Sequence, residues 1–433
     1  MKQKTTPLGG RTWAALLIFG LFGQIAWVIE NMYFNVFLYN TISGDTSMIA
    51  AMVGWSAVTA TVTTLVMGAL SDKLGRRKGF IVAGYLLWGV SIAVFALVRS
   101  RPVPSGPAAV ALAAHGTAVL VVILDCVMTF FGSTANDAAF NAWVTDVTTV
   151  DNRGRTETVL SAMPLVAMLA VFGALDGLTQ SGNWSTFFLI VGALTALGGL
   201  LGLFFLREPE KLQRSEGDYF ANIIHGLRPA VVKQNPLLYL SLCALGVYCI
   251  SQQVYMPYLI IYIQRFLGIT DYTMLLAGVL IVSSVISVVL GRTVDRCGKL
   301  PSLRAAAPVG VAGLVLMYFA RGQWAVLGAG IVMLGAGMVI QACCNGLIRD
   351  YTPAGKAGQF QGIRIIFQVL IPMVIGPSLG VLAIRSTGMT YEELGVVKEV
   401  PTPGIFLMAA AILLLLGVVI ALLGRRMGKE AAR

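Results

Sequence analysis

The sequence predicts an all-α membrane protein in which twelve transmembrane helices form two pseudo-symmetric six-helix bundles. Three observations support this fold class. First, 57% of the 433 residues are hydrophobic, only 12% are charged and the mean hydropathy is +0.80, a composition too poor in charge for a soluble chain of this length. Second, apolar runs of about 20 residues, long enough to cross a bilayer, recur throughout. Third, the charged loops of the first half return in the second.

The internal duplication is visible in two pairs of charged segments. Gly68–Lys78, GALSDKLGRRK, is matched 223 residues later by Gly291–Leu300, GRTVDRCGKL, and both begin with the pattern Gly-x-x-x-Asp-basic-x-Gly-basic. A second pair, Asn141-AWVT-Asp146 and Asn345-GLIR-Asp350, repeats at an offset of 204. Charged loops repeated between apolar spans indicate a transporter built from two halves.

The apolar runs give the order of the predicted spans. They cover residues 12–40, 47–70, 79–98, 117–143, 157–180, 183–206, 237–265, 272–294, 301–320, 323–347, 359–384 and 402–424. The first run is too long for a cleaved signal peptide, so we interpret it as a helix. We therefore expect an N-terminal bundle over 1–206, a cytoplasmic linker over 207–236 and a C-terminal bundle over 237–433.

Basic residues are distributed unequally between the two sides of this arrangement. The termini and the even-numbered connections hold 25 of the 31 Lys and Arg residues. The opposite side holds the other six: Arg99, Arg101, Arg265, Arg321, Arg385 and Lys398. Because positive charge is retained in the cytoplasm during insertion, we expect both termini of a multi-pass cell-membrane protein to be cytoplasmic. This bias also explains the net charge of +11, so we do not expect nucleic-acid binding.

Several other function classes find no support in the sequence. It has no phosphate-binding P-loop and no evident pair of nucleophile and base, so we expect neither an ATP-driven pump nor an enzyme. The two histidines lie outside the centres of the spans and no Cys-x-x-Cys occurs, so we expect no metal and no cofactor. The expected partners are the lipid bilayer and a small-molecule solute, bound by a monomer.

The loop motif resembles that of the major facilitator superfamily, which lies between the second and third helices and again between the eighth and ninth. With twelve spans and a central linker, the resemblance covers the whole chain. It implies the major facilitator fold, with a central cavity that opens alternately to either side. A weaker resemblance, to the glycoside–pentoside–hexuronide:cation symporters and sucrose-type carriers, rests on acids in spans one and four. That branch has Arg-Pro-Trp after the motif, where this chain continues RRKGFIVAG.

The resemblance also implies a role for the loop motifs at the cytoplasmic face. Asp72, Arg76 and Asp146 would form a cluster that latches the bundles together in the outward-open state. Asp295, Lys299 and Asp350 would form its pseudo-symmetric partner. Glycines would permit a close helix approach and a tight turn, at Gly68 and Gly75 and at their counterparts Gly291 and Gly298. The alternative is that these charges only mark topology.

Polar residues inside spans one and four are the candidates for ion coupling. On a helical projection one face of span one carries Gln24, Trp27, Glu30, Asn31 and Asn35, and one face of span four carries Asp125, Thr129 and Asn136. From a rise of about 1.5 Å per residue, the two acids lie at similar depth. An intramembrane acid is a functional hypothesis by default, so we expect this pair to bind H⁺ or Na⁺. The alternative is a structural carboxylate within the bundle, and we interpret Asp176 as a solvated helix end.

The C-terminal half offers amides and phenols instead of acids. The candidates for solute binding are Tyr248, Gln252 and Tyr255 in span seven, Gln341 and Asn345 in span ten, and Arg364 and Gln368 in span eleven. When spans one and seven are aligned, Gln252 falls on Glu30, which assigns coupling to the N-terminal half. Amides and aromatic faces suit a hydroxyl-rich solute such as a sugar, although amides also join helices to one another.

These observations favour symport of a small polar solute with H⁺ or Na⁺. A drug or metabolite:proton antiporter remains an alternative, although span five, LSAMPLVAMLAVFGALDGL, lacks the Gly-Pro-x-x-Gly-Gly string usual in drug antiporters. A membrane receptor or scaffold without transport activity is the third possibility. The linker is too short for a folded output domain.

Overall fold

The structure is a computed structural model that describes residues 8–98, 107–148, 150–208, 228–353, 357–393 and 396–431. The chain separates into two compact units. Unit 1 comprises Met1–Ser43 and Val58–Tyr219, and unit 2 comprises Gly44–Ala57 and Phe220–Arg433. The predicted linker falls mostly on residues 209–227, which lie outside the described residues.

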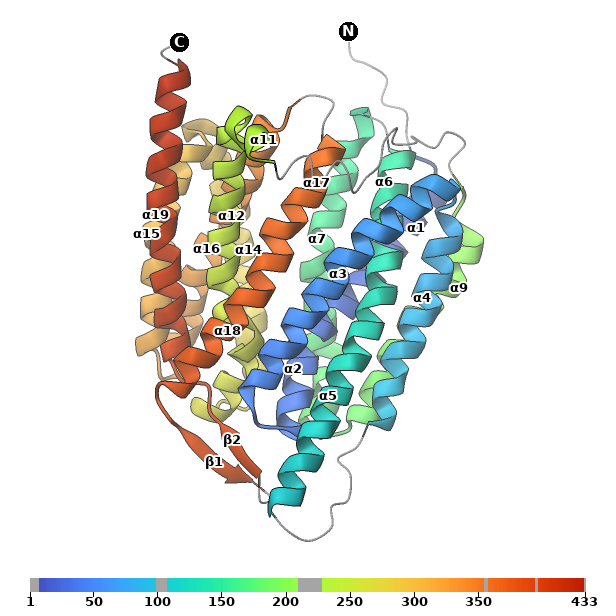
Figure 1. The fold of residues 1–433 in the computed structure, drawn as a ribbon, viewed down its shortest axis with the longest axis vertical. Coiled ribbons are helices and arrows are strands. Elements are labelled where there is room, and N and C mark those ends of the chain that lie inside the picture. The colour runs from blue at the N-terminus through green and yellow to red at the C-terminus, as the bar shows by residue number, and fades with distance from the viewer. Residues whose placement is uncertain are drawn as a thin grey trace. The chain divides into compact units, whose positions relative to one another are not determined.

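Unit 1 is helical throughout its described part (Figure 1). In chain order its elements are α1 (Gly10–Val28), η1 (Ile29–Tyr33), α2 (Phe34–Phe37), η2 (Leu38–Ile42), most of α3 (Thr46–Leu74), α4 (Lys78–Val94), η3 (Phe95–Leu97), α5 (Pro107–Gly132), η4 (Ser133–Phe140), α6 (Asn141–Val147), α7 (Val150–Ala174), α8 (Asp176–Gln180) and α9 (Trp184–Phe205).

Unit 2 contains the first residues of α3 and the rest of the described chain. Its elements are α11 (Pro229–Gln234), α12 (Pro236–Tyr255), η5 (Met256–Tyr258), α13 (Leu259–Ile261), η6 (Tyr262–Phe266), α14 (Tyr272–Cys297), α15 (Lys299–Phe319), α16 (Gln323–Tyr351), α17 (Ala357–Ile365), η7 (Ile366–Leu370), α18 (Ile371–Arg385), β1 (Thr390–Glu393), β2 (Val396–Glu399) and α19 (Gly404–Ala431).

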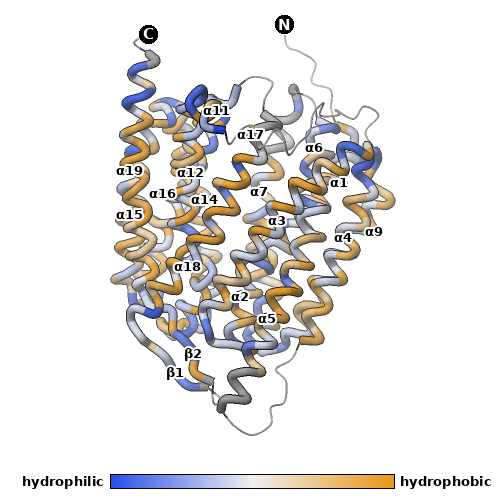
Figure 2. Tube along the Cα trace, in the orientation of Figure 1, coloured by the Kyte–Doolittle hydropathy of each residue, from blue (hydrophilic) through white to orange (hydrophobic). Residues whose placement is uncertain are grey.

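The length and composition of these helices identify a multi-pass membrane protein. Within the described residues, 11 helices are long and apolar enough to cross a bilayer, and Val159–Ala174, inside the predicted fifth span, is a shorter apolar helix. Figure 2 shows this pattern on α19, which is apolar along most of its length and hydrophilic near its C-terminal end. The all-helical membrane fold predicted from the sequence is confirmed.

The packing of helices inside unit 1 repeats inside unit 2. In unit 1, α1 packs against α7 and α9, and α4 packs against α9, α5 and η4. In unit 2, α12 packs against α18 and α19, and α15 packs against α19 and α16. The same helix neighbours therefore recur at equivalent places of each half. The sequence repeat in the loops is thus accompanied by a repeat of the packing.

Close helix contacts in unit 1 depend on small residues. A Cβ atom added to Gly192 of α9 would lie 2.6 Å from the backbone oxygen of Gly89 in α4, so a larger residue there would force the two backbones apart. Small residues at helix crossings are typical of membrane bundles, where van der Waals contact between helices replaces the hydrophobic effect. This close packing holds α4 in the position from which it supports the polar site described below.

A short β-hairpin joins α18 to α19, in a segment that the sequence suggested only as a loop. The strands β1 and β2 are antiparallel, with Thr390 opposite Glu399 and Glu393 opposite Val396. The segment TYEE-LG-VVKE carries β-branched residues and a glycine but only four residues per strand. So short a strand gives a weak pattern beside apolar runs of 20 residues.

Candidate functional site

Two carboxylates and a threonine form a polar site inside unit 1. Glu30, in η1, has only 7% of its surface exposed, and the hydroxyl of Thr129 in α5 donates a hydrogen bond of 2.8 Å to its Oε1. Asp125 is 1% exposed and lies one helical turn before Thr129, on the same face of α5. The structure therefore brings the two predicted acids into one buried neighbourhood.

The backbone at this site departs from a regular α-helix. Glu30 sits in the π-helical segment η1, and Asn136 sits in the π-helical segment η4 that follows α5. A π-helical turn is rare, occurs often at functional sites, and rotates the residues after it relative to those before. A projection at a constant angle per residue cannot represent this rotation. The sequence could therefore identify the polar residues but not their final directions.

Asn136 belongs to a hydrogen-bonded chain that fastens α4 to its neighbours. Its side-chain amide donates to the hydroxyl of Tyr85 at 2.7 Å, and that hydroxyl donates to the backbone oxygen of Phe19 at 2.8 Å. Close by, the rings of Trp27 and Trp88 lie 5.0 Å apart. Asn136 and Trp27 thus act in the packing of unit 1.

The remaining amides predicted on span one bond to their own helix or stay half-buried. Asn31 is exposed and donates to the backbone oxygen of Trp27, and Asn35 is fully buried and donates to that of Asn31, both at 2.8 Å. Gln24 is half-buried. These side chains satisfy backbone groups of the helix that carries Glu30.

Asp176 is not the solvated helix end that the sequence suggested. The residue begins α8, is only 2% exposed, and accepts hydrogen bonds from Tyr33 Oη at 2.8 Å and from Gln180 Nε2 at 2.6 Å. A buried carboxylate is stabilised by such donors, and Asp176 uses them to join η1 to α8. The prediction failed because the donor Tyr33 lies 143 residues away in sequence.

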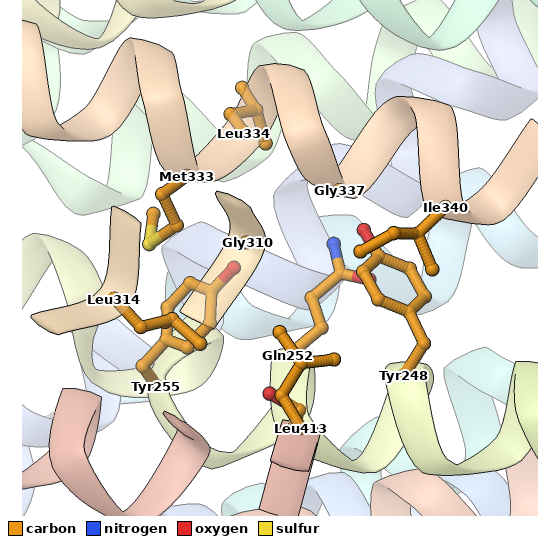
Figure 3. Close-up of a pocket in the computed structure, with 11 residues that line it drawn as sticks. Tyr248, Gln252, Tyr255, Gly310, Leu314, Met333, Leu334, Gly337, Ile340 and Leu413 are labelled. Carbon is orange, nitrogen blue, oxygen red and sulfur yellow. The ribbon is translucent and has the colours of Figure 1, made fainter. Parts of the chain in front are cut away.

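A second polar site lies in unit 2, between α12, α15, α16 and α19. Tyr248, Gln252 and Tyr255 line a cavity of about 10 Å³, which has room for about one water molecule. Figure 3 shows the Gln252 side chain pointing toward Tyr248, and Tyr255 and Met333 line the same cavity. A Cβ on Gly337 would lie 2.7 Å from the Tyr248 hydroxyl, so the absence of a side chain at this position makes room for the phenol.

Two of the other candidates in unit 2, Asn345 and Gln368, bind an arginine. Arg364 of α17 donates from Nε to Oε1 of Gln368 and from Nη2 to Oδ1 of Asn345, each at 3.1 Å. Gln368 lies in the π-helical segment η7. Gln341 is half-buried on α16, four residues before Asn345. Asn345 of α16 and Gln368 of η7 are therefore joined through one guanidinium group.

The first loop motif forms a buried ion cluster, but its basic member is Arg77 and not Arg76. Arg77 is 2% exposed, forms an ion pair with Asp72, and donates from Nε to Oδ2 of Asp146 at 3.0 Å. Its backbone N–H binds the Glu208 carboxylate at 2.9 Å. Arg76 is exposed. The expectation for Arg76 is corrected because the turn at Gly75 points the second of the two arginines inward.

The glycines of the motifs differ in what they provide. Gly75 and Gly298 adopt positive φ angles of 63° and 89°, which favour glycine at the end of a helix. At Gly68 a Cβ would meet the Cβ of Ala138 at an ordinary distance of 4.0 Å, and at Gly291 it would meet nothing within 4 Å. The tight turns are present, whereas the packing around Gly68 and Gly291 does not require glycine.

The second motif contains one ion pair among the described side chains. Lys299 Nζ lies 2.5 Å from Asp350 Oδ2 and also donates to the backbone oxygen of Gly346. Both partners are partly exposed, so solvent weakens the pair. The side chain of Asp295 lies outside the described residues.

The sequence matches the family described as the Major Facilitator Superfamily over residues 12–377 and 242–433. The chain belongs to the major facilitator superfamily. A search of curated protein sequences finds no match.

Solved structures of major facilitator transporters resemble the fold. A bacterial homologue of the human lysosomal transporter Spinster, inward-facing and occupied, superposes with a TM-score of 0.70 at 14% identity, covering 96% of both chains. The nucleoside transporter NupG gives 0.66 at 12% identity (95% and 98% covered), and the E. coli xylose transporter XylE, inward open and partially occluded, gives 0.65 at 14% (94% and 97%). At these identities the likeness shows the fold. As a major facilitator protein, the chain is a transporter and not an enzyme.

Proposed function

We propose that this transporter moves a small polar solute, sugar-like by preference, by alternating access driven by a gradient of H⁺ or Na⁺. The observation that carries the coupling is the buried pair Glu30 and Asp125, with Thr129 bonded to Glu30. A buried carboxylate has a high free-energy cost unless it binds a cation, a proton or a hydrogen-bond donor. A second acid in the same neighbourhood increases the affinity of the pair for positive charge. Unit 1 therefore supplies the ion site.

The choice of solute rests on the polar site in unit 2. Tyr248, Gln252 and Tyr255 present phenol and amide groups around a cavity, and such groups can donate to and accept from hydroxyls without carrying charge. Solutes of two transporters with the same fold, xylose and nucleosides, have this chemistry. The cavity of about 10 Å³ is smaller than a sugar, so solute binding requires rearrangement of these side chains.

The topology of the proposal follows the distribution of basic residues. With 25 of 31 Lys and Arg on the side of the termini, we place both termini in the cytoplasm and the chain in the cell membrane. The motif cluster around Arg77 then faces the cytoplasm. The hairpin formed by β1 and β2 faces outward.

Uptake into proteoliposomes tests this function directly. With labelled D-xylose and labelled uridine as probes, we expect uptake of at least one probe to rise several-fold when a pH or Na⁺ gradient is imposed. An ionophore that collapses the gradient should remove the rise. Gradient-driven uptake of neither probe, with the protein folded and correctly inserted, would refute the sugar-like solute. Gradient-driven loss of solute in place of uptake would identify an antiporter.

Gln252→Ala tests solute recognition in unit 2. The substitution removes one amide from the cavity wall, and a hydrogen bond to a neutral group contributes about 0.5–1.5 kcal/mol. We expect the apparent KM for the transported probe to rise about 2- to 13-fold, while the dependence on the ion gradient persists. Gln323→Ala, at the exposed start of α16, is the matched control and should transport normally. An unchanged KM in Gln252→Ala would exclude this cavity from solute binding.

A further inference from the structure

The hairpin between α18 and α19 is fixed by charged residues to the start of α3. Arg385, the last residue of α18, donates from Nε to Glu399 Oε1 at 2.7 Å and from Nη2 to Asp45 Oδ1 at 3.0 Å. Glu399 ends β2, and Asp45 directly precedes α3. One guanidinium group therefore joins the hairpin, the end of α18 and the beginning of α3.

Glu399 also binds the amino end of α3. Its Oε2 accepts a hydrogen bond of 3.1 Å from the backbone N–H of Thr46 and another from the Thr46 hydroxyl. Asp45 Oδ1 accepts from the backbone N–H of Ser47 at 2.8 Å. The first N–H groups of a helix have no partner within the helix and carry partial positive charge, so acceptors here are stabilising. One of these acceptors comes from a residue 353 positions later.

The backbones of the hairpin and of the segment before α3 are in direct contact. The N–H of Glu399 donates to the backbone oxygen of Gly44 at 3.0 Å. A Cβ on Gly44 would lie 2.6 Å from the Cα of Lys398, so no other residue fits without displacing the hairpin. Lys398 is covered there, with 6% of its surface exposed. The hairpin therefore packs directly against the backbone that precedes α3.

The strand β1 is in contact with a different element, η6. The guanidinium group of Arg265, in η6, lies 5.4 Å from the centre of the Tyr391 ring, a cation–π contact. An isolated two-stranded hairpin is marginally stable in water. The contacts with η6, with α18 and with the start of α3 therefore decide whether β1 and β2 stay in place.

We propose that the hairpin β1–β2 is a releasable strap that holds the first turn of α3 and must release it during the transport cycle. The strap contacts the end of α3 that belongs to unit 2, and the same helix continues from Val58 as part of unit 1. This inference rests on the proposed transport function and on the outward placement of the hairpin. It adds a regulating contact that the loop motifs do not contain.

The contacts are of a strength that permits repeated release. The side chains of Arg385 and Asp45 are 49% and 39% exposed, and that of Glu399 is 22% exposed. Exposed ion pairs are weak because water competes for both partners. The hydrogen bonds to charged groups are stronger. We therefore expect single substitutions in the strap to change the population of released hairpin by about tenfold and leave the fold intact.

A labelling experiment tests the strap without any solute. Lys398→Cys, in a Cys297→Ser background because Cys297 is exposed, should react slowly with a membrane-impermeant maleimide added from outside. Adding Glu399→Gln or Arg385→Gln should speed the reaction about tenfold, because the strap then leaves Gly44 more often. Glu392→Gln is the matched control, since Glu392 is exposed in β1, and it should leave the rate unchanged. Equal rates in all four proteins would overturn the proposal.

A cross-link tests the strap in the opposite direction, because it prevents the hairpin from leaving the start of α3. Thr46→Cys and Glu399→Cys, joined by a short reducible bis-thiosulfonate, should stop exchange of labelled D-xylose or uridine, and reduction should restore it. The single variant Thr46→Cys, treated in the same way, should remain active. Exchange that continues in the cross-linked protein would refute the strap. A different result would refute the proposed solute and not the strap. In that case neither probe would exchange in the untreated or the reduced protein, while the labelling rate would still depend on the strap residues.

Discussion

Glu30→Gln is expected to abolish uphill accumulation of the solute. In wild type, one proton moving down a gradient of one pH unit supplies about 1.4 kcal/mol, enough to concentrate a solute about tenfold. The amide keeps the shape of the side chain and can still accept from Thr129, but it cannot bind and release the coupled cation. The ratio of internal to external solute should therefore approach one. This ratio is measured by uptake into proteoliposomes. The solute used is the probe whose transport by the wild-type protein depends most on the gradient.

Counterflow separates loss of coupling from loss of folding. Exchange of labelled for unlabelled solute needs no net ion movement, so it should survive in Glu30→Gln. The same substitution at exposed Glu392 is the control and should concentrate the solute normally. Asp125→Asn, judged in the same way, tests the second acid of the pair. Accumulation by Glu30→Gln with unchanged dependence on pH and Na⁺ would remove Glu30 from the mechanism.

Arg77→Gln is expected to cause the largest loss of stability among the substitutions considered. Arg77 is buried between Asp72 and Asp146, and Asp146 has 4% of its side chain exposed. Removing the cation leaves two carboxylates near each other in a site with little water, and breaking a buried ion pair in this way costs about 3–5 kcal/mol. For a unit of this size we expect the melting temperature to fall by roughly 6–20 °C. Thermal unfolding of the purified protein in detergent measures it.

The neighbouring arginine supplies the control for Arg77. Arg76 carries the same charge one position earlier but is exposed, so Arg76→Gln should change the melting temperature little. In the double variant Arg77→Gln/Asp146→Asn, one of the two uncompensated carboxylates is neutralised. We therefore expect the melting temperature to lie between those of Arg77→Gln and wild type. If Arg76→Gln and Arg77→Gln proved equally mild, the loop motif would act as a topology signal only.

Much of the fold was predictable because the sequence patterns that identify it extend over many residues. Apolar runs of about 20 residues and a loop motif repeated after 223 residues identify a duplicated helical bundle. The hairpin was not predictable, because strands of four residues carry little periodicity and because β1–β2 owes its position largely to Gly44 and Asp45, which are distant in sequence. A local sequence pattern does not reveal contacts between residues that are far apart in the chain.

The candidate site was predictable in residue type and less so in geometry. Glu30, Asp125 and Thr129 stood out because polar groups inside apolar spans are costly, and the structure brings them together. The choice between Arg76 and Arg77 depended on a left-handed turn at Gly75, and the role of Asp176 depended on Tyr33 in another helix. The π-helical segments added rotations that a regular projection omits.

The helix α3 belongs in part to each of the two units. It runs for 29 residues without interruption from Thr46 to Leu74, and the boundary between units falls between Ala57 and Val58. At about 1.5 Å per residue, the part of α3 in unit 2 is about 18 Å long and the part in unit 1 about 26 Å. Because the helix is unbroken, the strap at Thr46 and the ion cluster at Asp72 lie near the two ends of one continuous element about 44 Å long.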